Sequence, residues 1–194
     1  MGRSRETAVD DIASLRFGVR KDQPGRMITD YHTAHIPPKA HNKDGAYVTY
    51  RQYLSDAIFL VALEGKKEQL EEIRDALINP VYPPYLGRRS CPPSGRMFLE
   101  IVEGDVEKVL NEYEWQASDW YKKKMPKFIS LEIVTDSISR ETQVWDFPTS
   151  FNRNHRQFKN RFVKHWWTPQ MIENSLGKNP IDTNHDAIST LREE

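Results

Sequence analysis

The sequence predicts an α+β fold in which helices cover one face of a mainly antiparallel β-sheet. Some short runs alternate apolar with polar residues, as strands do, and others place apolar residues three or four positions apart, as helices do. Their order is helix, strand, strand, strand, helix and strand, followed by further strands. This order is typical of a ferredoxin-like (RRM-like) core. The 194 residues, 38% of them hydrophobic, suffice for one domain with a core.

The chain is predicted to begin with a helix and two strands. Apolar residues at helical spacing predict a helix over residues 7–15. In residues 16–20, Phe17 and Val19 alternate with polar neighbours, which predicts a strand. A turn at Gln23-Pro24-Gly25 would let residues 27–33 pair back on it as a second strand.

A loop, a strand and a helix are predicted next. Residues 34–47 contain Pro37-Pro38 and show no periodicity, which predicts a mobile loop. Residues 57–63 are an apolar run typical of a buried strand. Apolar residues at helical spacing predict a helix over residues 66–78, which ends before Asn79-Pro80.

The second half of the chain is predicted to be mostly strands. Strands are predicted at residues 97–102, 128–134 and 143–147, and a short helix is predicted at residues 106–110. Phe158, Phe162 and Trp166 have helical spacing, although residues 161–164 are equally consistent with a terminal strand. The domain is predicted to span residues 1–167. Residues 168–194 have little periodicity and are predicted to be a C-terminal tail that is flexible or a docking arm.

Charge is balanced over the whole chain but not along it. Lys+Arg and Asp+Glu each number 28, so no net field favours a polyanion. Residues 147–172, however, contain no acidic residue. Their basic side chains are Arg153, Arg156, Lys159, Arg161 and Lys164, with His155 and His165. Such a run attracts phosphate, although charged runs are also common on ordinary solvated surfaces.

Cys91, the single cysteine, excludes an internal disulfide and a cysteine-rich zinc site, which is consistent with a reducing cytoplasm. No spacing of residues implies a metal or another cofactor. The longest apolar run, residues 57–63, is too short for a signal peptide or a membrane span. We therefore expect a soluble cytoplasmic protein without a membrane partner.

Arginine and tyrosine lie close together in two segments, residues 50–57 and 84–92. Arginine supplies a fixed charge, paired donors and a flat surface, and a tyrosine ring can stack on a base of any sequence. Gly87 would let the backbone approach a phosphate, which Arg88 and Arg89 would then clamp. The alternatives are a Tyr85 ring packed on its turn, an ordinary turn glycine with solvated arginines, and, for Arg51, an ion pair with Asp56 or a plain surface position.

Four motifs carry a family resemblance. They are D-Y-H-T at residues 30–33, Y-R-Q-Y-L-S-D-A at 50–57, P-Y-L-G-R-R-S-C-P at 84–92, and F-P-x-S-F followed by R-x-F-x-x-R-x-V at 156–163. Together they resemble the CasD subunit family of type I-E CRISPR Cascade, within the repeat-associated RNA-binding superfamily, over about residues 8–163. The resemblance implies a ferredoxin-like fold with an inserted thumb at about residues 30–53, which would become ordered around RNA and CasC.

The resemblance also implies a function. Members of the family are non-catalytic subunits of an antiviral ribonucleoprotein complex that engages target DNA. They bind and cap the 5′ handle of the CRISPR RNA and join the backbone subunit CasC to the large subunit CasA, while CasE cleaves the RNA. By motif position, Arg51 and Tyr85 match residues that sandwich a handle base. The other RNA-binding positions that the motifs imply are His32, Tyr50, Gly87, Arg88, Arg89, Arg156 and Arg161.

Several alternatives remain open from the sequence. Arg156 and Arg161 would neutralise phosphate or brace the sheet. The protein could be a metal-independent endoribonuclease of repeat RNA that uses His32, or His155 near Lys159, or a general binder of single-stranded RNA. The chain also enters the family pattern near residue 8, without the family's first strand. We therefore expect either that the recorded start is too late or that a partner covers the exposed sheet backbone.

Overall fold

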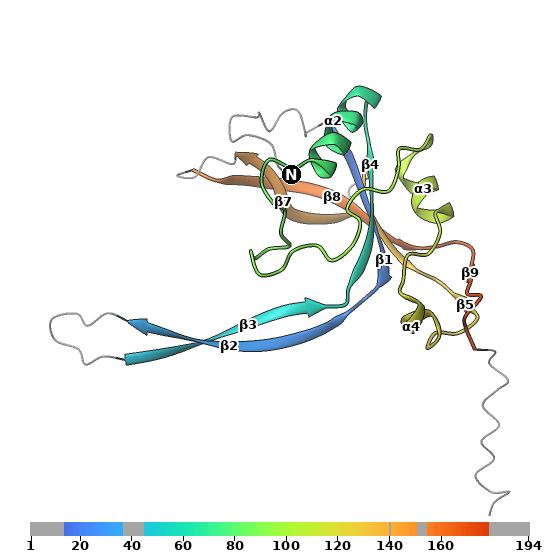
Figure 1. Cartoon of the computed structure of the whole chain (residues 1–194). Coiled ribbons are helices and arrows are strands. Elements are labelled where there is room, and N and C mark those ends of the chain that lie inside the picture. The colour runs from blue at the N-terminus through green and yellow to red at the C-terminus, as the bar shows by residue number, and fades with distance from the viewer. Residues whose placement is uncertain (1–13, 37–44, 140, 151–154, 179–194) are drawn as a thin grey trace, which may run out of the picture. The chain divides into compact units, whose positions relative to one another are not determined.

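The computed structural model describes residues 14–36, 45–139, 141–150 and 155–178 (Figure 1). Packing of the backbone divides the chain into two compact units. The first is built from Met1–Arg20, Leu60–Glu114 and Ser130–Met171. The second is built from Lys21–Phe59, Trp115–Ile129 and Ile172–Glu194. None of the helices in the described ranges is long and apolar enough to cross a membrane.

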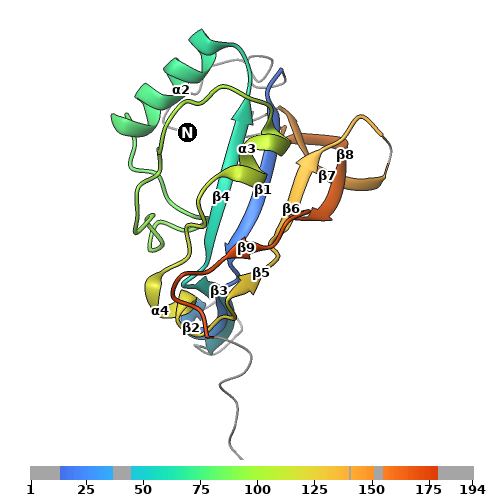
Figure 2. The same cartoon turned by 90° about the vertical axis from the view of Figure 1, so that its right-hand side faces the viewer.

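A five-stranded sheet has the strand order β4-β1-β6-β8-β7. Its strands are β1 (Arg16–Gln23), β4 (Ile58–Glu64), β6 (Glu132–Asp136), β7 (Thr142–Ser150) and β8 (Gln157–Trp167). The pairs β1–β6, β6–β8 and β7–β8 are antiparallel, and Figure 2 shows β4, β1 and β6 side by side. With the helices α2 (Lys67–Ile78) and α3 (Val106–Glu112), the sheet confirms the predicted α+β class, whereas the ferredoxin-like arrangement stays a prediction.

The core of the first unit lies between α3 and the sheet. Leu60, Val106, Leu110 and Ile133 form a buried cluster. Gly18 on β1 permits this packing, because a Cβ atom there would lie only 2.6 Å from a methyl carbon of Leu110. Asp105 caps α3 by accepting a hydrogen bond from the Lys108 N–H at 2.8 Å, which fixes where the helix begins.

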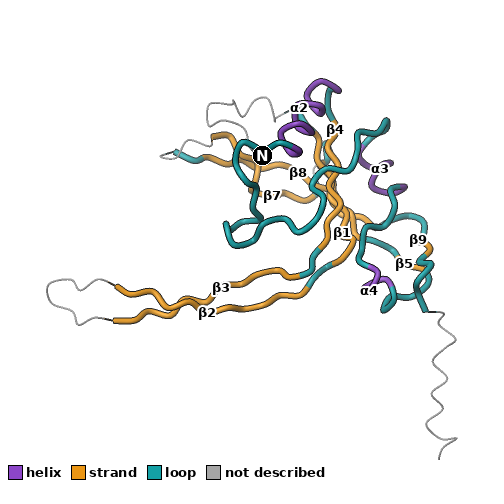
Figure 3. The backbone as a smooth tube through the Cα atoms, viewed as in Figure 1, coloured by secondary structure: helices purple, strands orange, loops and turns teal. Residues whose placement is uncertain are grey.

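The second unit contains a long hairpin of β2 (Arg26–Ile36) and β3 (Gly45–Ser55), the two-stranded ribbon in Figures 1 and 3. Two predictions are wrong here. Residues 27–33 pair with β3 rather than with residues 16–20, and both ends of the predicted loop at 34–47 are strand, while residues 37–44 lie outside the described ranges. β2 does not pair back on β1, because β1 lies between β4 and β6 in the five-stranded sheet and both of its edges are occupied; β2 pairs with β3 instead.

The rest of the second unit is short elements tied together by side-chain hydrogen bonds. They are α4 (Asp119–Lys122), β5 (Phe128–Ile129) and β9 (Ile172–Glu173). Asn174, 2% exposed, donates from its amide to the Lys122 oxygen at 2.8 Å and the Pro126 oxygen at 3.1 Å. Part of the predicted tail thus forms β9 and buries Asn174, and residues 179–194 lie outside the described ranges. The C-terminal tail that is flexible or a docking arm stays a prediction.

The predicted helices at 66–78 and 106–110 are confirmed as α2 and α3, and the predicted strand at 143–147 lies within β7. The helix predicted over residues 7–15 lies largely outside the described ranges. The run at 57–63 is a strand, β4, as predicted, but only Leu60 in it is buried, so the prediction that this strand is buried is wrong.

Three other sequence interpretations change. Residues 97–102 are not a strand, although their Leu99 packs on the core. The single strand predicted at 128–134 is two strands, β5 and β6. Phe158, Phe162 and Trp166 lie on a strand, β8, because a spacing of four residues keeps side chains on one face of a strand as well as of a helix.

Candidate nucleic-acid interface

The hairpin register determines which predicted RNA-binding residues share a face. Asp30 lies opposite Arg51, Tyr31 opposite Tyr50 and His32 opposite Thr49. Opposite residues share a face, and successive residues alternate between faces. Arg51 and His32 therefore lie on one face of the ribbon and Tyr50 on the other, although Tyr50 and Arg51 are adjacent in sequence.

The face that carries Arg51 combines charged side chains with tyrosine and histidine. Tyr53 and His32 are its neighbours along the same face, and Asp30 lies directly across the ribbon. Within the described ranges Arg51 forms no ion pair, either with Asp30 or with Asp56. The salt bridge to Asp56 that was the alternative for Arg51 is thus absent there. Its guanidinium is available to a ligand.

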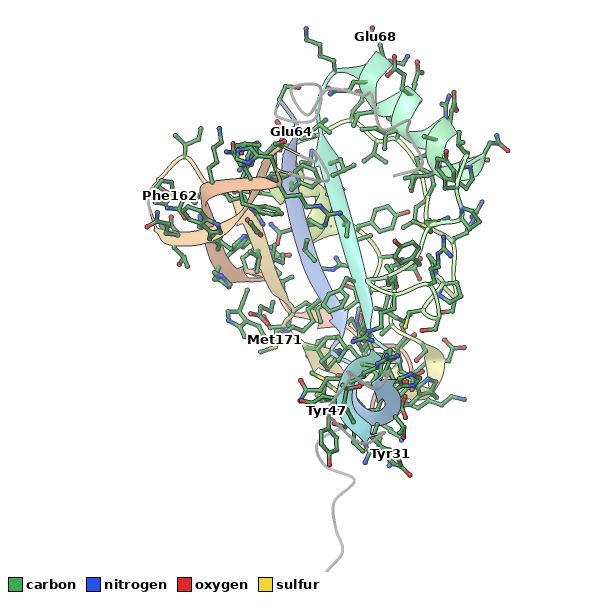
Figure 4. All side chains as sticks on the ribbon, turned by 90° about the vertical axis from the view of Figure 1, so that its left-hand side faces the viewer. Tyr31, Tyr47, Glu64, Glu68, Phe162 and Met171 are labelled. Atoms are coloured by element: carbon green, nitrogen blue, oxygen red, sulfur yellow. The ribbon has the colours of Figure 1, made fainter. Side chains whose placement is uncertain are left out.

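The opposite face of the hairpin carries aromatic and apolar side chains together with uncharged polar ones such as Thr29 and Gln52. Tyr31 and Tyr50, which lie directly opposite each other, are 71% and 76% exposed. The face also carries Met27, Val48 and Leu54, each about half exposed. Tyr31, and Tyr47 on the Arg51 face, stand off the ribbon as labelled sticks in Figure 4. A ribbon with both faces exposed has little stability of its own, so this surface suits a partner that covers it.

The segment at residues 84–92 forms a closed loop with the predicted phosphate-binding residues at its tip. The Leu86 N–H donates to the Cys91 oxygen at 2.8 Å, and the Cys91 N–H donates to the Arg88 oxygen at 2.9 Å. Gly87 has a φ of +80°, in the left-handed region that favours glycine, and a Cβ atom there would meet nothing within 4 Å. The backbone at Gly87 is therefore open to a ligand.

Exposure of the side chains agrees with this arrangement. Arg88 and Arg89 are exposed at the tip of the loop, and Tyr85 is 51% exposed just before it. A Tyr85 ring packed on its own turn would be less accessible. The loop thus presents a ring, an open backbone and two guanidinium groups within five residues.

Arg161 braces the sheet. It donates to Asp136 on β6, and its Nε and Nη2 donate to the two carboxylate oxygens of Asp146 on β7 at 2.5 and 2.8 Å. The hydrogen bond from Arg161 holds the pKa of Asp146 below its usual value, and the bond to Asp146 raises the pKa of Arg161. This agrees with the bracing alternative. Arg156, in contrast, is exposed just before β8.

The predicted RNA-binding residues therefore fall into two groups. His32, Tyr50 and Arg51 share the hairpin, and Tyr85, Gly87, Arg88 and Arg89 share the closed loop. The hairpin belongs to the second unit and the loop to the first. The sandwich of one base by Arg51 and Tyr85 stays a prediction.

Sequence reasoning did not single out the exposed aromatic residues Tyr31 and Tyr47 on the hairpin or Trp145 on β7. Tyr31 lies in the D-Y-H-T motif. Residues 45–55 are rich in tyrosine and β-branched residues, a composition typical of strands, and this was the signal that could have revealed the hairpin. In the described parts of the chain, no group of three or more His, Cys, Asp or Glu side chains could hold a metal ion.

Comparisons with known proteins identify the family. The model of the CRISPR-associated protein family Cas_Cas5 matches residues 1–164. The chain is 34% identical over 126 residues to the CRISPR system Cascade subunit CasD of Escherichia coli (strain K12); the match spans 57% of this chain and 56%, little more than half, of that relative.

A solved structure is also similar. It is a chain of a CRISPR RNA-guided surveillance complex, with a TM-score of 0.67 and 27% sequence identity over 93% of this chain and 78% of that chain. The family match covers all four motifs and both groups of residues described above. The chain therefore belongs to the Cas_Cas5 family of CRISPR-associated proteins.

Proposed function

We propose that the chain is a non-catalytic subunit of a Cascade surveillance complex and that it binds and caps the 5′ handle of the CRISPR RNA. The observation that carries this proposal is the similarity, at a TM-score of 0.67 over 93% of the chain, to a chain of a CRISPR RNA-guided surveillance complex. The identity to CasD agrees with it, although this chain matches little more than half of CasD.

In this proposal the hairpin and the closed loop each contact the handle. Arg51 supplies a guanidinium that no carboxylate in the described ranges neutralises, with His32 on the same face. Tyr85 offers a half-exposed ring for stacking, and Arg88 and Arg89 contact phosphate beside the open backbone of Gly87. Arg156 contributes a further exposed charge.

Protein partners would cover the remaining hairpin surface. Among the side chains that the structure describes, the face with Tyr31 and Tyr50 carries no charge and exposes aromatic and aliphatic groups, a composition that suits a protein contact. We assign this contact to the CasC backbone subunit and propose that the chain joins CasC to the large subunit CasA. Target DNA would be met through the assembled complex in the cytoplasm.

Two substitutions test the proposal. Arg51→Ala and Tyr85→Ala should each weaken binding of an RNA that carries the repeat-derived handle by about fivefold or more, because a stacked base contributes about 1–3 kcal/mol. The melting temperature should change little, since neither side chain is buried. Fluorescence anisotropy with handle RNA and with an RNA of scrambled handle measures the effect.

Matched controls separate binding from general damage. Arg74→Ala removes an arginine from α2, and Tyr82→Ala removes a tyrosine that is 65% exposed in the segment preceding the closed loop. Both should bind handle RNA as the unsubstituted chain does. If handle and scrambled RNA bind equally, or if specific cleavage of repeat RNA occurs in the presence of a chelator, the proposed function is wrong.

A further inference from the structure

Strands β7 and β8 present a second aromatic surface that the proposed function does not use. The register places Gln143 opposite Phe162, Trp145 opposite Asn160 and Pro148 opposite Phe158. Opposite residues share a face, as do residues two apart on one strand. Gln143, Trp145, Phe158, Asn160 and Phe162 therefore form one continuous surface, here named the Trp145 face.

Two large side chains of this face, Trp145 and Phe158, are exposed, and Phe162 is partly buried. Trp145 is 69% exposed and Phe158 43%, and Gln143 and Asn160 are exposed as well. Further along β8, Trp166 lies on the same face but packs on the buried cluster beside Ile133. The face thus continues from the core outward to an exposed aromatic surface. A tryptophan so exposed is unusual, because this side chain is highly buried on average.

The charged side chains that β7 and β8 contribute to the Trp145 face are all basic. β8 contains no acidic residue, and the one acid of β7, Asp146, is held by Arg161 on the opposite face. Lys164 shares the Trp145 face, with its ammonium 5.9 Å from the Trp166 ring, and exposed Arg156 immediately precedes β8. Within the described residues of β7 and β8, a phosphate on this face would therefore meet cations and no carboxylate.

We propose that the Trp145 face is a second binding site for unpaired nucleotides, distinct from the handle contacts of the hairpin and the closed loop. The Trp145 indole stacks on a base. The amides of Asn160 and Gln143, which carry both donors and acceptors, bond to base edges, and Lys164 and Arg156 contact phosphate. Base faces and phosphates are common to single-stranded RNA and DNA, so either can occupy the face.

The full chain tests this site with probes that contain no handle. Oligo(U) and oligo(dT) of about 12 nucleotides span a typical single-strand site. Trp145→Ala should weaken binding of these probes by about fivefold or more in fluorescence anisotropy. The matched control is Trp167→Ala, since Trp167 is 61% exposed on the same strand pair but lies on the other face. Its affinity should not change.

The two probes distinguish the ligand sources. Equal losses with oligo(U) and oligo(dT) support recognition through base and phosphate, and a loss with only one of them supports the site and identifies its nucleic acid. Asn160→Ala, which removes an exposed amide, should weaken binding as well and guards against misfolding of the Trp145 variant. Trp145→Tyr should retain most of the affinity, because a phenol ring still stacks.

Three results would overturn the site: unchanged binding of both probes by Trp145→Ala, an equal loss in Trp167→Ala, or loss of assembly with CasC or CasA while probe binding is unchanged. The last would make the face a protein contact. The Arg51→Ala measurement with handle RNA is independent of all three, so failure of the proposed function and failure of this site are distinguishable.

Discussion

At the scale of single residues, Arg20 is a fully buried charge that contributes to the fold. Its Nη1 donates to the carbonyl oxygens of Leu110 and Tyr113, both at 2.7 Å, and its Nη2 donates to that of Glu114 at 2.9 Å. The last carbonyls of a helix have no partner within it and carry partial negative charge. Arg20 thereby supplies hydrogen bonds to the free carbonyl groups at the end of α3 and fixes this helix against β1.

Arg20→Met should therefore lower the free energy of unfolding by about 3 kcal/mol, because several buried carbonyl groups lose a charged donor. Urea unfolding followed by circular dichroism measures this loss. Arg26→Met, which removes an exposed arginine from β2, serves as the control and should have an effect within about 0.5 kcal/mol. A stable Arg20→Met variant would show that the carbonyl contacts contribute little.

At the scale of elements, ion pairs of Arg161 with two carboxylates connect the strands at one edge of the five-stranded sheet. A bulge in β7 between Trp145 and Phe147 places the extra residue, Asp146, within reach of both Nε and Nη2 of Arg161. The same guanidinium also reaches Asp136 on β6. Three strands are thus connected by one side chain. The Lys159 ammonium, 4.7 Å from the Phe147 ring, adds a further contact across β7 and β8.

The ion pair between Arg161 and Asp146 predicts that stability depends on pH. The hydrogen bond from Arg161 lowers the folded pKa of Asp146 below the unfolded value of about 3.9. The carboxylate therefore contributes stability above the unfolded pKa, and this contribution is lost as pH falls through the folded pKa. Asp146→Asn should be less stable than the unsubstituted chain by about 0.5 kcal/mol near pH 7, because the side chain is 45% exposed, and the difference should vanish in acid.

Urea unfolding of both proteins at several pH values checks this expectation. In the control, Arg161→Met is introduced into the unsubstituted protein and into Asp146→Asn, and the two are compared again. Because the guanidinium that lowers the Asp146 pKa is then absent, the pH-dependent difference in stability should disappear. A difference that stays constant from neutral to acid pH would contradict the assignment.

Elements with a strong local signal could be predicted from the sequence. The helical periodicity of α2 and the apolar run of β4 were sufficient, because local spacing alone defines them. Residues 16–20 alternate as predicted, but Gly18 and Arg20 are the buried positions rather than the apolar Phe17 and Val19. Only the packing of α3 above β1 decides this, and that contact joins segments about ninety residues apart.

For the candidate site too, some features could be predicted from local sequence and others could not. Residue chemistry predicted Arg51, Tyr85 and the tip of the closed loop as candidate RNA-binding positions, because arginine follows tyrosine at residues 50–51 and tyrosine, glycine and arginine lie close together at residues 85–89. It did not reveal that Tyr50 and Arg51 face opposite sides of a ribbon, nor that Arg161 pairs with two carboxylates. Strand register and cross-strand partners determine both facts, and neither is encoded in a local pattern.

At the scale of the whole molecule, the net charge of zero determines how the protein must bind a polyanion. No long-range field attracts RNA to the chain, so attraction comes from local groups of cations that face few acids. The closed loop concentrates two exposed guanidinium groups, Arg88 and Arg89, beside an open backbone. Each phosphate that these groups neutralise releases counterions, which makes the affinity depend on salt.

The salt dependence of the RNA affinity gives the number of phosphate contacts. For single strands, the slope of log K against log salt changes by about 0.7 for each phosphate contact. Replacing both Arg88 and Arg89 with Gln should make the slope for handle RNA shallower by about 1.4 in anisotropy titrations at several salt concentrations. Replacing the exposed pair Lys66 and Lys67 with Gln keeps the overall charge change equal and should leave the slope unchanged. Equal changes in the two variants would mean that net charge, rather than the loop, attracts the RNA.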